Sequence, residues 1–327
     1  MKVSIISVNW NGAAILRKFI ENLLSIEYEN LEIIIVDNGS TDNSVEIISG
    51  YSKIILIKLP VNTGFAGGNN EGIQISSGDF VLLINTDVLC RPDVITKLLN
   101  EYNHMIQNNP ALKIGALMPV IKLENGKINS LGSYLYADFQ PFNLGFNEDE
   151  SRINDLISSR ITTGFYGACV MLNRKMIDET GLMNEEYFLY HEETELAIRG
   201  AISGWEYILV RDCSVDHFHS YSSKELSFKK IFFSERNRLF NLIKFGGIKQ
   251  ILISPLYTFK RFILSLKNKK LIHSSSEKKG NKYLNLAGVI FAIAAAHISL
   301  LFFLDILVSY KLKNWSSDFK IKTYEVL

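Results

Sequence analysis

Four apolar segments in the first part of the chain each end in polar residues, and amphipathic segments lie between them. The apolar segments cover residues 2–8, 31–36, 54–59 and 80–84, and each has the length of a buried strand. Strands that alternate with helices over short connections predict an α/β fold with a parallel, doubly wound sheet. The 327 residues, 47% of them hydrophobic, suffice for one such domain and an extension.

The polar residues at the strand ends predict where a ligand would bind. Asn9 follows the first strand, Asp37 the second, Asn62 comes soon after the third, and Asn85-Thr86-Asp87 follows the fourth. The carboxyl ends of parallel strands share one edge, where open α/β sheets bind their ligands. Asp87 could hold a divalent metal against a phosphate there, or the segment could only shape a turn. The recurring pattern favours a nucleotide cleft.

A glycine-rich loop over residues 62–70 opens the helix after the third strand. It lacks the G-x-G-x-x-G spacing of a dinucleotide fingerprint, and no Gly-Lys-Ser/Thr of a P-loop follows. Its glycines could let the backbone approach a ligand, or only make a tight turn. The loop alone is weak support for either reading.

A second chemically active group is the acidic cluster Glu192, Glu193 and Glu195, in the first turn of a predicted helix. The helix dipole favours acids there without any function, and Glu195 with Arg199 could form an ordinary i, i+4 pair. Aromatic residues directly before the cluster could instead raise a carboxylate pKa toward neutrality, as a general base requires.

Two histidines, His217 and His219, follow a predicted strand at residues 206–210 and lie on one side of an extended segment. Either could complete a metal site begun by Asp87. Residues 137–158 show no clear period and predict a loop over the cleft, and residues 161–172 predict a strand with a glycine-broken start.

Four motifs in chain order resemble those of the family 2 glycosyltransferases, which have the GT-A fold. They are Val8-Asn9-Trp10-Asn11-Gly12, Val36-Asp37-Asn38-Gly39-Ser40-Thr41-Asp42, the glycine loop from Asn62 to Gly72, and Asn85-Thr86-Asp87. The acidic cluster and the segment 217–222 follow at the expected places. The resemblance covers residues 1 to about 240. The glycine loop and the Asn-Thr-Asp motif are most similar to those of the rhamnosyltransferase-like branch of bacterial polysaccharide assembly.

The resemblance implies inverting transfer of a sugar, rhamnose being one candidate, from dTDP-rhamnose or a UDP-sugar to a lipid-linked or growing cell-surface glycan. Glu193 occupies the position of the catalytic base, with Glu192 and Glu195 as neighbouring candidates. Asp87 and His217 would bind Mg²⁺ or Mn²⁺, which neutralises the leaving diphosphate. The implied nucleotide-sugar-binding residues are Val8, Asn9, Asn11, Asp37, Asn62, Gly64, Asn69, Asn85, Thr86 and Asp87.

Two positions depart from the usual family pattern. Asn85 stands where the metal motif more often begins with Asp, so one charge is missing, and Glu193 stands where Asp is the commoner base.

The alternative to an enzyme is a catalytically silent nucleotide-sugar-binding or membrane scaffolding protein. Donor hydrolysis or transfer that needs added metal would distinguish the enzyme from that alternative.

Charge is distributed unevenly along the chain. Residues 224–282 carry 15 Lys and Arg against 3 Asp and Glu, whereas residues 1–223 carry 16 against 28. We therefore expect a GT-A domain over 1–225, a basic amphipathic helical region over 226–282, and a hydrophobic helix and tail over 283–327. The mixture of basic and apolar residues over 226–266 suits helices on an anionic membrane surface, or a core-packing helix pair with a solvated face.

The apolar stretch over residues 284–304 has about the length of a membrane-spanning helix. A spanning helix, a re-entrant or interfacial hairpin, and a soluble helix that forms a homodimer all stay open, and lysines at both ends give no direction. We expect the protein at the cytoplasmic face of the inner (plasma) membrane, held peripherally or by one C-terminal hydrophobic helix, near a polyprenyl-linked glycan acceptor. No nucleic-acid-binding motif is evident, so we do not expect a nucleic-acid partner.

Overall fold

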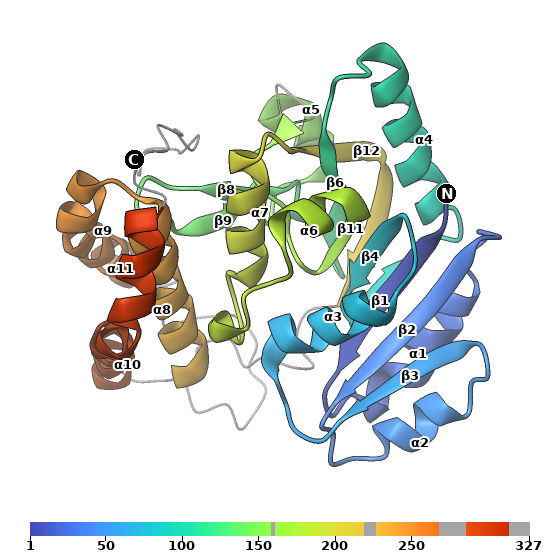
Figure 1. The fold of residues 1–327 in the computed structure, drawn as a ribbon, viewed down its shortest axis with the longest axis horizontal. Coiled ribbons are helices and arrows are strands. Elements are labelled where there is room, and N and C mark those ends of the chain that lie inside the picture. Colours follow the sequence, from blue (N-terminus) through green and yellow to red (C-terminus); the bar gives the residue numbers. More distant parts are fainter. Residues whose placement is uncertain (158–160, 219–226, 268–285, 314–327) are drawn as a thin grey trace. The chain divides into compact units, whose positions relative to one another are not determined.

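The computed structural model of the chain describes residues 1–157, 161–218, 227–267 and 286–313 (Figure 1). The chain forms two compact units. The first, here called the sheet unit, comprises Met1–Tyr134 and Phe142–Tyr221. The second, the helical unit, comprises Leu135–Pro141 and Ser222–Leu327.

The secondary structure alternates in the first half of the chain, as the sequence pattern predicts. The strands are β1 (Val3–Asn9), β2 (Leu31–Asn38), β3 (Ile54–Leu59), β4 (Phe80–Ile84), β5 (Val88–Cys90), β6 (Ile114–Leu123), β7 (Ile128–Ser130), β8 (Ser133–Leu135), β9 (Pro141–Asn143), β10 (Ile161–Thr162), β11 (Cys169–Asn173) and β12 (Glu206–His217). The helices of the sheet unit are α1 (Ala13–Leu24), α2 (Ser44–Ser49), α3 (Gly64–Ile75), α4 (Val94–Asn108), α5 (Ile153–Leu156), α6 (Arg174–Thr180) and α7 (Glu192–Ile202).

Ten of the strands in the described part of the chain form one sheet, in the order β10-β12-β6-β11-β4-β1-β2-β3, with β5 beside β12 and β7 beside β6. Strands β3, β2, β1 and β4 run parallel, and β12 runs parallel to β6. Strand β11 is antiparallel to both β4 and β6. The prediction of an α/β fold with a mostly parallel central sheet is therefore confirmed.

Alternate residues of the strands bury on opposite faces of the sheet. Ile5 and Leu82 belong to one apolar core together with the buried side of α1 and α4. Ile6 and Leu83 belong to the other core, on the side where Ala66 of α3 packs. Both faces are covered, which explains why these strands read as continuous apolar runs in the sequence.

Three local predictions needed correction. The expected strand over residues 161–172 is divided into β10 and β11, and the strand expected at 206–210 continues as β12 to His217 past an irregularity between Val210 and Ser214. The region 137–158, expected to be a loop, contains β9, the short helix α5 and a 3-10 turn at Glu150–Arg152. Short elements such as these have too few residues to show a period.

The helical unit contains α8 (Phe228–Phe245), α9 (Ile248–Lys267), α10 (Leu286–Ser299) and α11 (Leu304–Lys313). The long apolar helix expected over 284–304 is divided, since a 3-10 turn at Leu300–Phe303 separates α10 from α11. Among the described residues, no helix combines the length and the apolar character needed to cross a membrane.

Candidate active site

The ends of β1 and β2 are tied together by their polar residues. The Asn9 Nδ2 atom donates to Asp37 Oδ1 at 2.9 Å and to Ser40 Oγ at 3.2 Å. The Asn11 backbone N–H also donates to Ser40 Oγ, and Asn11 Oδ1 accepts from the Thr41 N–H at 2.8 Å. Asn9 and Asp37 are both buried. The structure therefore brings Asn9, Asn11 and Asp37 together at one sheet edge, as the strand-end pattern predicts.

The glycine loop is anchored on the same edge by Asn38. Its Oδ1 atom accepts from the Thr63 N–H at 2.8 Å, and its Nδ2 atom donates to the Gly64 carbonyl at 2.9 Å. Asn62 Oδ1 accepts from the Gly64 N–H at 2.8 Å. The carboxamides of Asn38 and Asn62 thus hold the start of α3 in place, a role that the motif alone did not reveal.

Two glycines let α3 lie close to its neighbours. Gly64 has a φ of +79°, and a Cβ atom there would lie 2.1 Å from the Phe188 carbonyl oxygen. A Cβ atom on Gly68 would lie 2.7 Å from a methyl carbon of Val8. Glycine is therefore required for close backbone approach at both positions. Val8 thus packs against α3. Asn69 lies within α3 rather than at the sheet edge, and it is buried and donates to the Phe65 carbonyl.

Asp87 and His217 face each other because β5 pairs with the end of β12, where Val88 lies opposite His217. The Asp87 Oδ1 atom lies 3.2 Å from His217 Nε2, and both side chains are largely buried. The other ring nitrogen, Nδ1, lies 2.9 Å from Asn129 Oδ1 on β7. The imidazole ring is thus held between the Asp87 carboxylate and the Asn129 side chain.

The Asp87 carboxylate and the His217 imidazole offer two side-chain ligands to a divalent metal. No cluster of three or more His, Cys, Asp or Glu side chains that could ligate a metal occurs among the described residues. Mg²⁺ is commonly held by one or two protein ligands, with substrate phosphates and water completing its shell. His219 lies outside the described residues.

Asn85 and Thr86 lie beside Asp87 and are partly exposed. The Asn85 N–H donates to the Ala168 carbonyl at 2.9 Å, and the Asn85 carbonyl accepts from the Val88 N–H at 3.1 Å. These bonds form the turn that the sequence suggested as the alternative reading. The turn and the metal reading are compatible, since the turn places the Asp87 carboxylate beside His217.

The acidic cluster begins α7 directly after a strained backbone segment. Phe188, Tyr190 and His191 all have positive φ values, between 59° and 69°. Such conformations cost free energy for residues with a Cβ and are enriched at functional sites. The Phe188 carbonyl accepts from the Phe65 N–H at 2.7 Å, so this segment is held against the start of α3.

The three carboxyl groups of the cluster have different surroundings. Glu195 is buried and pairs with Arg199 at 2.8 Å, which suits a structural role. Burial, followed by the charge of Glu193, raises the pKa of Glu192 well above its ordinary value, and one of its carboxyl oxygens has no hydrogen-bond partner in the described residues. Burial raises the pKa of Glu193 to about 7, although its side chain keeps partial access to solvent. Glu193 is therefore the member best suited to proton transfer near neutral pH.

Tyr166 links the acidic cluster to the Asp87–His217 pair. Burial, followed by the charges of Glu193 and Asp87, raises the pKa of its hydroxyl. Its ring centroid lies 6.2 Å from that of His217. Next to it, a Cβ atom on Gly167 would lie 3.3 Å from the Phe65 ring and 3.6 Å from Glu193 Cγ, so Gly167 lies close to both side chains.

Tyr166 and Asn129 are site residues that the sequence pattern did not reveal. Asn129 is 88 residues from His217 in the chain. A scan for side chains of suitable chemistry would have included Asn129, but nothing in its local pattern separates it from a turn residue.

Known proteins with similar sequences are glycosyltransferases. The chain is 32% identical over 117 residues to an uncharacterised glycosyltransferase of Haemophilus influenzae, a match that covers 35% of this chain and 46% of that protein. It is 22% identical over 245 residues to the N-acetylglucosaminyl-diphospho-decaprenol L-rhamnosyltransferase of Mycobacterium tuberculosis, covering 67% of this chain and 76% of that protein. The chain thus spans less than half the length of the first relative.

The fold agrees with a solved structure and with the profile of one family. The mannosyltransferase PcManGT from Pyrobaculum calidifontis, solved with GDP-Man and Mn²⁺, has a TM-score of 0.55 and 14% identity, covering 97% of this chain and 88% of that one. At this identity the likeness supports the GT-A type of fold alone. The profile described as Glycosyl transferase family 2 matches residues 4–181, more than half of the chain. The chain therefore belongs to glycosyl transferase family 2.

Proposed function

We propose that the protein is a metal-dependent inverting glycosyltransferase that moves a sugar from a nucleoside-diphosphate donor to an acceptor hydroxyl. The observation that carries this proposal is the grouping of Glu193, Tyr166, Asp87 and His217 in the sheet unit. A carboxyl group with a pKa near 7 then lies near a pair of side chains suited to a cation. Single-step transfer with inversion needs both a base and a way to neutralise the leaving diphosphate.

Glu193 would accept the proton of the acceptor hydroxyl as the oxygen attacks the anomeric carbon. With a pKa near 7, a substantial fraction of Glu193 is ionised at neutral pH. The carboxylate is then also basic enough to take a proton from the acceptor hydroxyl. Tyr166 keeps its proton, since its pKa is raised, so its hydroxyl can still donate a hydrogen bond.

Asp87 and His217 would hold Mg²⁺ or Mn²⁺, and the ion would neutralise charge on the departing nucleoside diphosphate. Asn129 supports this arrangement by orienting the imidazole of His217. Asn9, Asn11 and Asp37 would bind the nucleoside, because they form a joined group at the same carboxyl edge of the parallel strands.

We further propose a lipid-linked glycan as the acceptor and dTDP-rhamnose as the first donor to test. Support comes from the mycobacterial relative, which by its name is a rhamnosyltransferase for a diphospho-decaprenol-linked sugar. Because a lipid-linked acceptor would be held in a membrane, we also propose that the protein works at the cytoplasmic face of the plasma membrane.

The test is release of nucleoside diphosphate from a panel of dTDP-, UDP- and GDP-sugars, with Mg²⁺, with Mn²⁺ and with a chelator. Wild-type protein is expected to release diphosphate from at least one donor, and only with metal. Asp87→Asn is expected to lower that release more than about a hundredfold, because it removes the only charged protein ligand of the pair.

Asp93→Asn is the matched control, since Asp93 lies six residues later and forms an ion pair with Lys97 on the surface. It is expected to keep wild-type release and metal dependence. Release that survives in the chelator, or that is equal in both variants, would remove Asp87 from the mechanism. Absence of release with every donor, with nucleotide binding retained, would favour the silent binding protein.

A further inference from the structure

Helix α9 of the helical unit has its polar side facing inward and its apolar side facing outward. Four large apolar side chains, Ile248, Leu252, Leu256 and Phe259, are 55%, 74%, 70% and 63% exposed. Their spacing of four, four and three residues places them on one side of the helix, over a length of about 16 Å. We call this row the α9 stripe.

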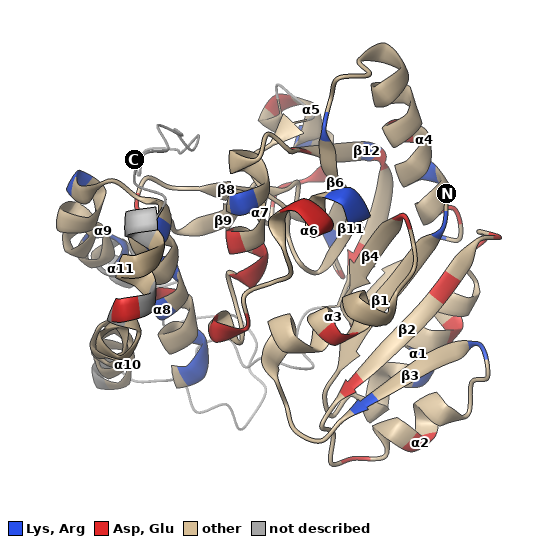
Figure 2. Cartoon of the chain, in the orientation of Figure 1, with Lys and Arg blue, Asp and Glu red and all other residues tan. Residues whose placement is uncertain are grey.

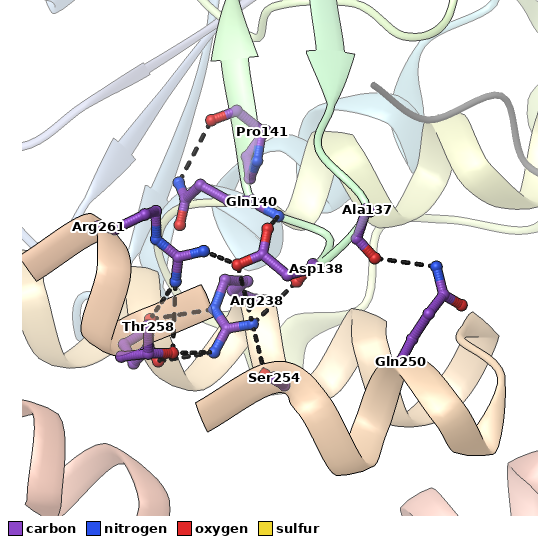
Figure 3. A network of polar contacts seen from close by, with 10 residues as sticks. Ala137, Asp138, Gln140, Pro141, Arg238, Gln250, Ser254, Thr258 and Arg261 are labelled. Atoms are coloured by element: carbon purple, nitrogen blue, oxygen red, sulfur yellow. Dashed lines mark hydrogen bonds and ion pairs between the residues drawn. The ribbon is translucent and has the colours of Figure 1, made fainter. Parts of the chain in front are cut away.

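The opposite side of α9 carries polar residues with the same spacing. Gln250, Ser254, Thr258 and Arg261 each lie two residues after a member of the α9 stripe, which is about 200° around the helix. These four side chains point to the segment at Ala137–Pro141 and to α8 (Figure 3). A surface helix of a protein in water normally has the reverse orientation.

Hydrogen bonds and ion pairs hold the polar side of α9 in this orientation. Arg238 of α8 is fully buried and donates to Ser254 Oγ and Thr258 Oγ1, both at 3.0 Å. Arg261 pairs with Asp138, which is also fully buried (Figure 3). Gln250 Nε2 donates to the Ala137 carbonyl at 2.9 Å.

The same network includes Glu235 of α8, whose carboxylate accepts from Arg238 at 2.7 and 3.0 Å. Two arginines therefore face two carboxylates, Asp138 and Glu235, inside the helical unit. Because removing one partner of such a network leaves an uncompensated buried charge, rotating α9 to bury its apolar side would be costly. The outward direction of the α9 stripe is thus set by the polar side.

The charges beside the α9 stripe indicate what could cover it. Lys249 and Lys260 are exposed and, by their spacing, lie along one edge of the stripe. Helix α9 contains no Asp or Glu (Figure 2). An apolar row with a basic edge matches a bilayer with anionic headgroups, which takes up both features in one plane. A second copy of the chain would bring two basic edges together and is a poorer match.

Other elements of the helical unit add to its exposed apolar surface. Their large exposed side chains are Ile290, Phe291 and Ile298 on α10, Leu301 and Phe302 in the following 3-10 turn, and Val308 on α11. Exposed apolar area on this scale is uncommon in soluble monomers and marks interaction surfaces.

We propose that the α9 stripe with Lys249 and Lys260 is a surface that docks in the plane of an anionic lipid bilayer. Binding comes from inserting the apolar row into the headgroup region and from attraction between the lysines and anionic lipid. The inference does not depend on the proposed chemistry, since neither nucleotide sugar nor acceptor is needed to observe it.

Flotation of the full chain with vesicles of phosphatidylcholine and phosphatidylglycerol, one to one, tests the proposal. Wild-type protein is expected to float with these vesicles and to bind pure phosphatidylcholine much less. The double variant Leu252→Ser, Leu256→Ser is expected to bind more than tenfold more weakly. The matched control is Ile55→Ser, Ile75→Ser, which removes two exposed apolar side chains from the sheet unit and is expected to bind as wild type.

A site-specific probe covers the case in which the double variant is poorly folded. Cys90, Cys169 and Cys213 are all buried, so a cysteine introduced as Leu252→Cys can be labelled selectively with an environment-sensitive dye. Its emission is expected to shift to the blue when vesicles are added, whereas a dye at Ile55→Cys should not respond.

Three results would overturn the proposal. They are equal binding of the α9 double variant and wild type, no emission shift at position 252, and equal binding to charged and neutral vesicles. A wild-type dimer that becomes monomeric in the α9 double variant, with no vesicle binding by either, would instead assign the stripe to self-association.

Discussion

The raised pKa of Glu193 predicts a conflict between stability and catalysis at this position. Burial raises the pKa from its ordinary 4.5 to about 7. At 1.36 kcal/mol per pH unit, ionising Glu193 in the folded chain costs at most about 3 kcal/mol of folding free energy. Glu193→Gln has no charge to bury, so we expect the variant to be more stable than wild type at pH 8 and inactive in transfer.

The pH range of the effect follows from the two pKa values. Below pH 4.5 the folded and unfolded chains both hold the proton, and the Glu193 carboxyl causes no penalty. Between 4.5 and about 7 the unfolded chain releases its proton first, so wild-type stability falls as the pH rises. Above about 7 the penalty is complete. The stability gap between Glu193→Gln and wild type should therefore open across this range and then level off.

Thermal unfolding of both proteins from pH 4.5 to 8.5 measures the gap. For a unit of roughly 200 residues, each kcal/mol corresponds to about 2–4 °C in the midpoint. In parallel, kcat/KM of wild type should fall about tenfold for each pH unit below 7, and Glu193→Gln should lose about a hundredfold or more. Nucleotide-sugar binding should persist in the variant.

Glu46→Gln is the control, because Glu46 also lies in the first turn of a helix but is exposed. Its midpoint should follow that of wild type at every pH. A constant gap between Glu193→Gln and wild type would refute the burial argument. Normal turnover by Glu193→Gln, or an acid limb that survives in it, would assign the base to another residue.

Two further substitutions test the contacts inside each unit, one substitution for the sheet unit and one for the helical unit. Gly64→Ala would place a Cβ atom 2.1 Å from the Phe188 carbonyl at a φ of +79°, so we expect a loss of more than about 2 kcal/mol of stability and weaker donor binding, measured by thermal unfolding and nucleotide titration. Asp138→Asn leaves the buried Arg238 and the partly buried Arg261 short of one negative partner, so we expect a loss of about 3 kcal/mol in denaturant unfolding.

The order and type of the elements around the site could be predicted from local patterns. The apolar run over 80–84 is β4 with the same bounds, because a strand buried on both faces is apolar at every residue. The run over 54–59 is β3 with the same bounds, although this strand lies at the end of the strand order and exposes Ile55 and Lys58. The positions of Asn9, Asp37 and Asp87 at one edge followed from parallel pairing, which places carboxyl ends side by side. The family motifs lie in this part of the chain.

The composition of the site depended on strand pairing that no local pattern reveals. Asn129 reaches His217 only because β6 pairs with both β7 and β12. Tyr166 is positioned near both Glu193 and Asp87 by the break between β10 and β11, which the glycines around it only suggested. The surroundings of the three carboxyl groups likewise distinguish Glu193 from Glu192 and Glu195, although nothing in the sequence tells them apart.

The C-terminal helices show most clearly which features depend on spacing along the chain and which depend on distant contacts. The spacing of basic and apolar residues over 226–266 is enough to predict helices of mixed character there. Which side of α9 faces outward depends instead on its partners in the fold. Its polar side is taken by Arg238 and by the Asp138 segment, about a hundred residues away in the chain, and this distant partner leaves the apolar side exposed.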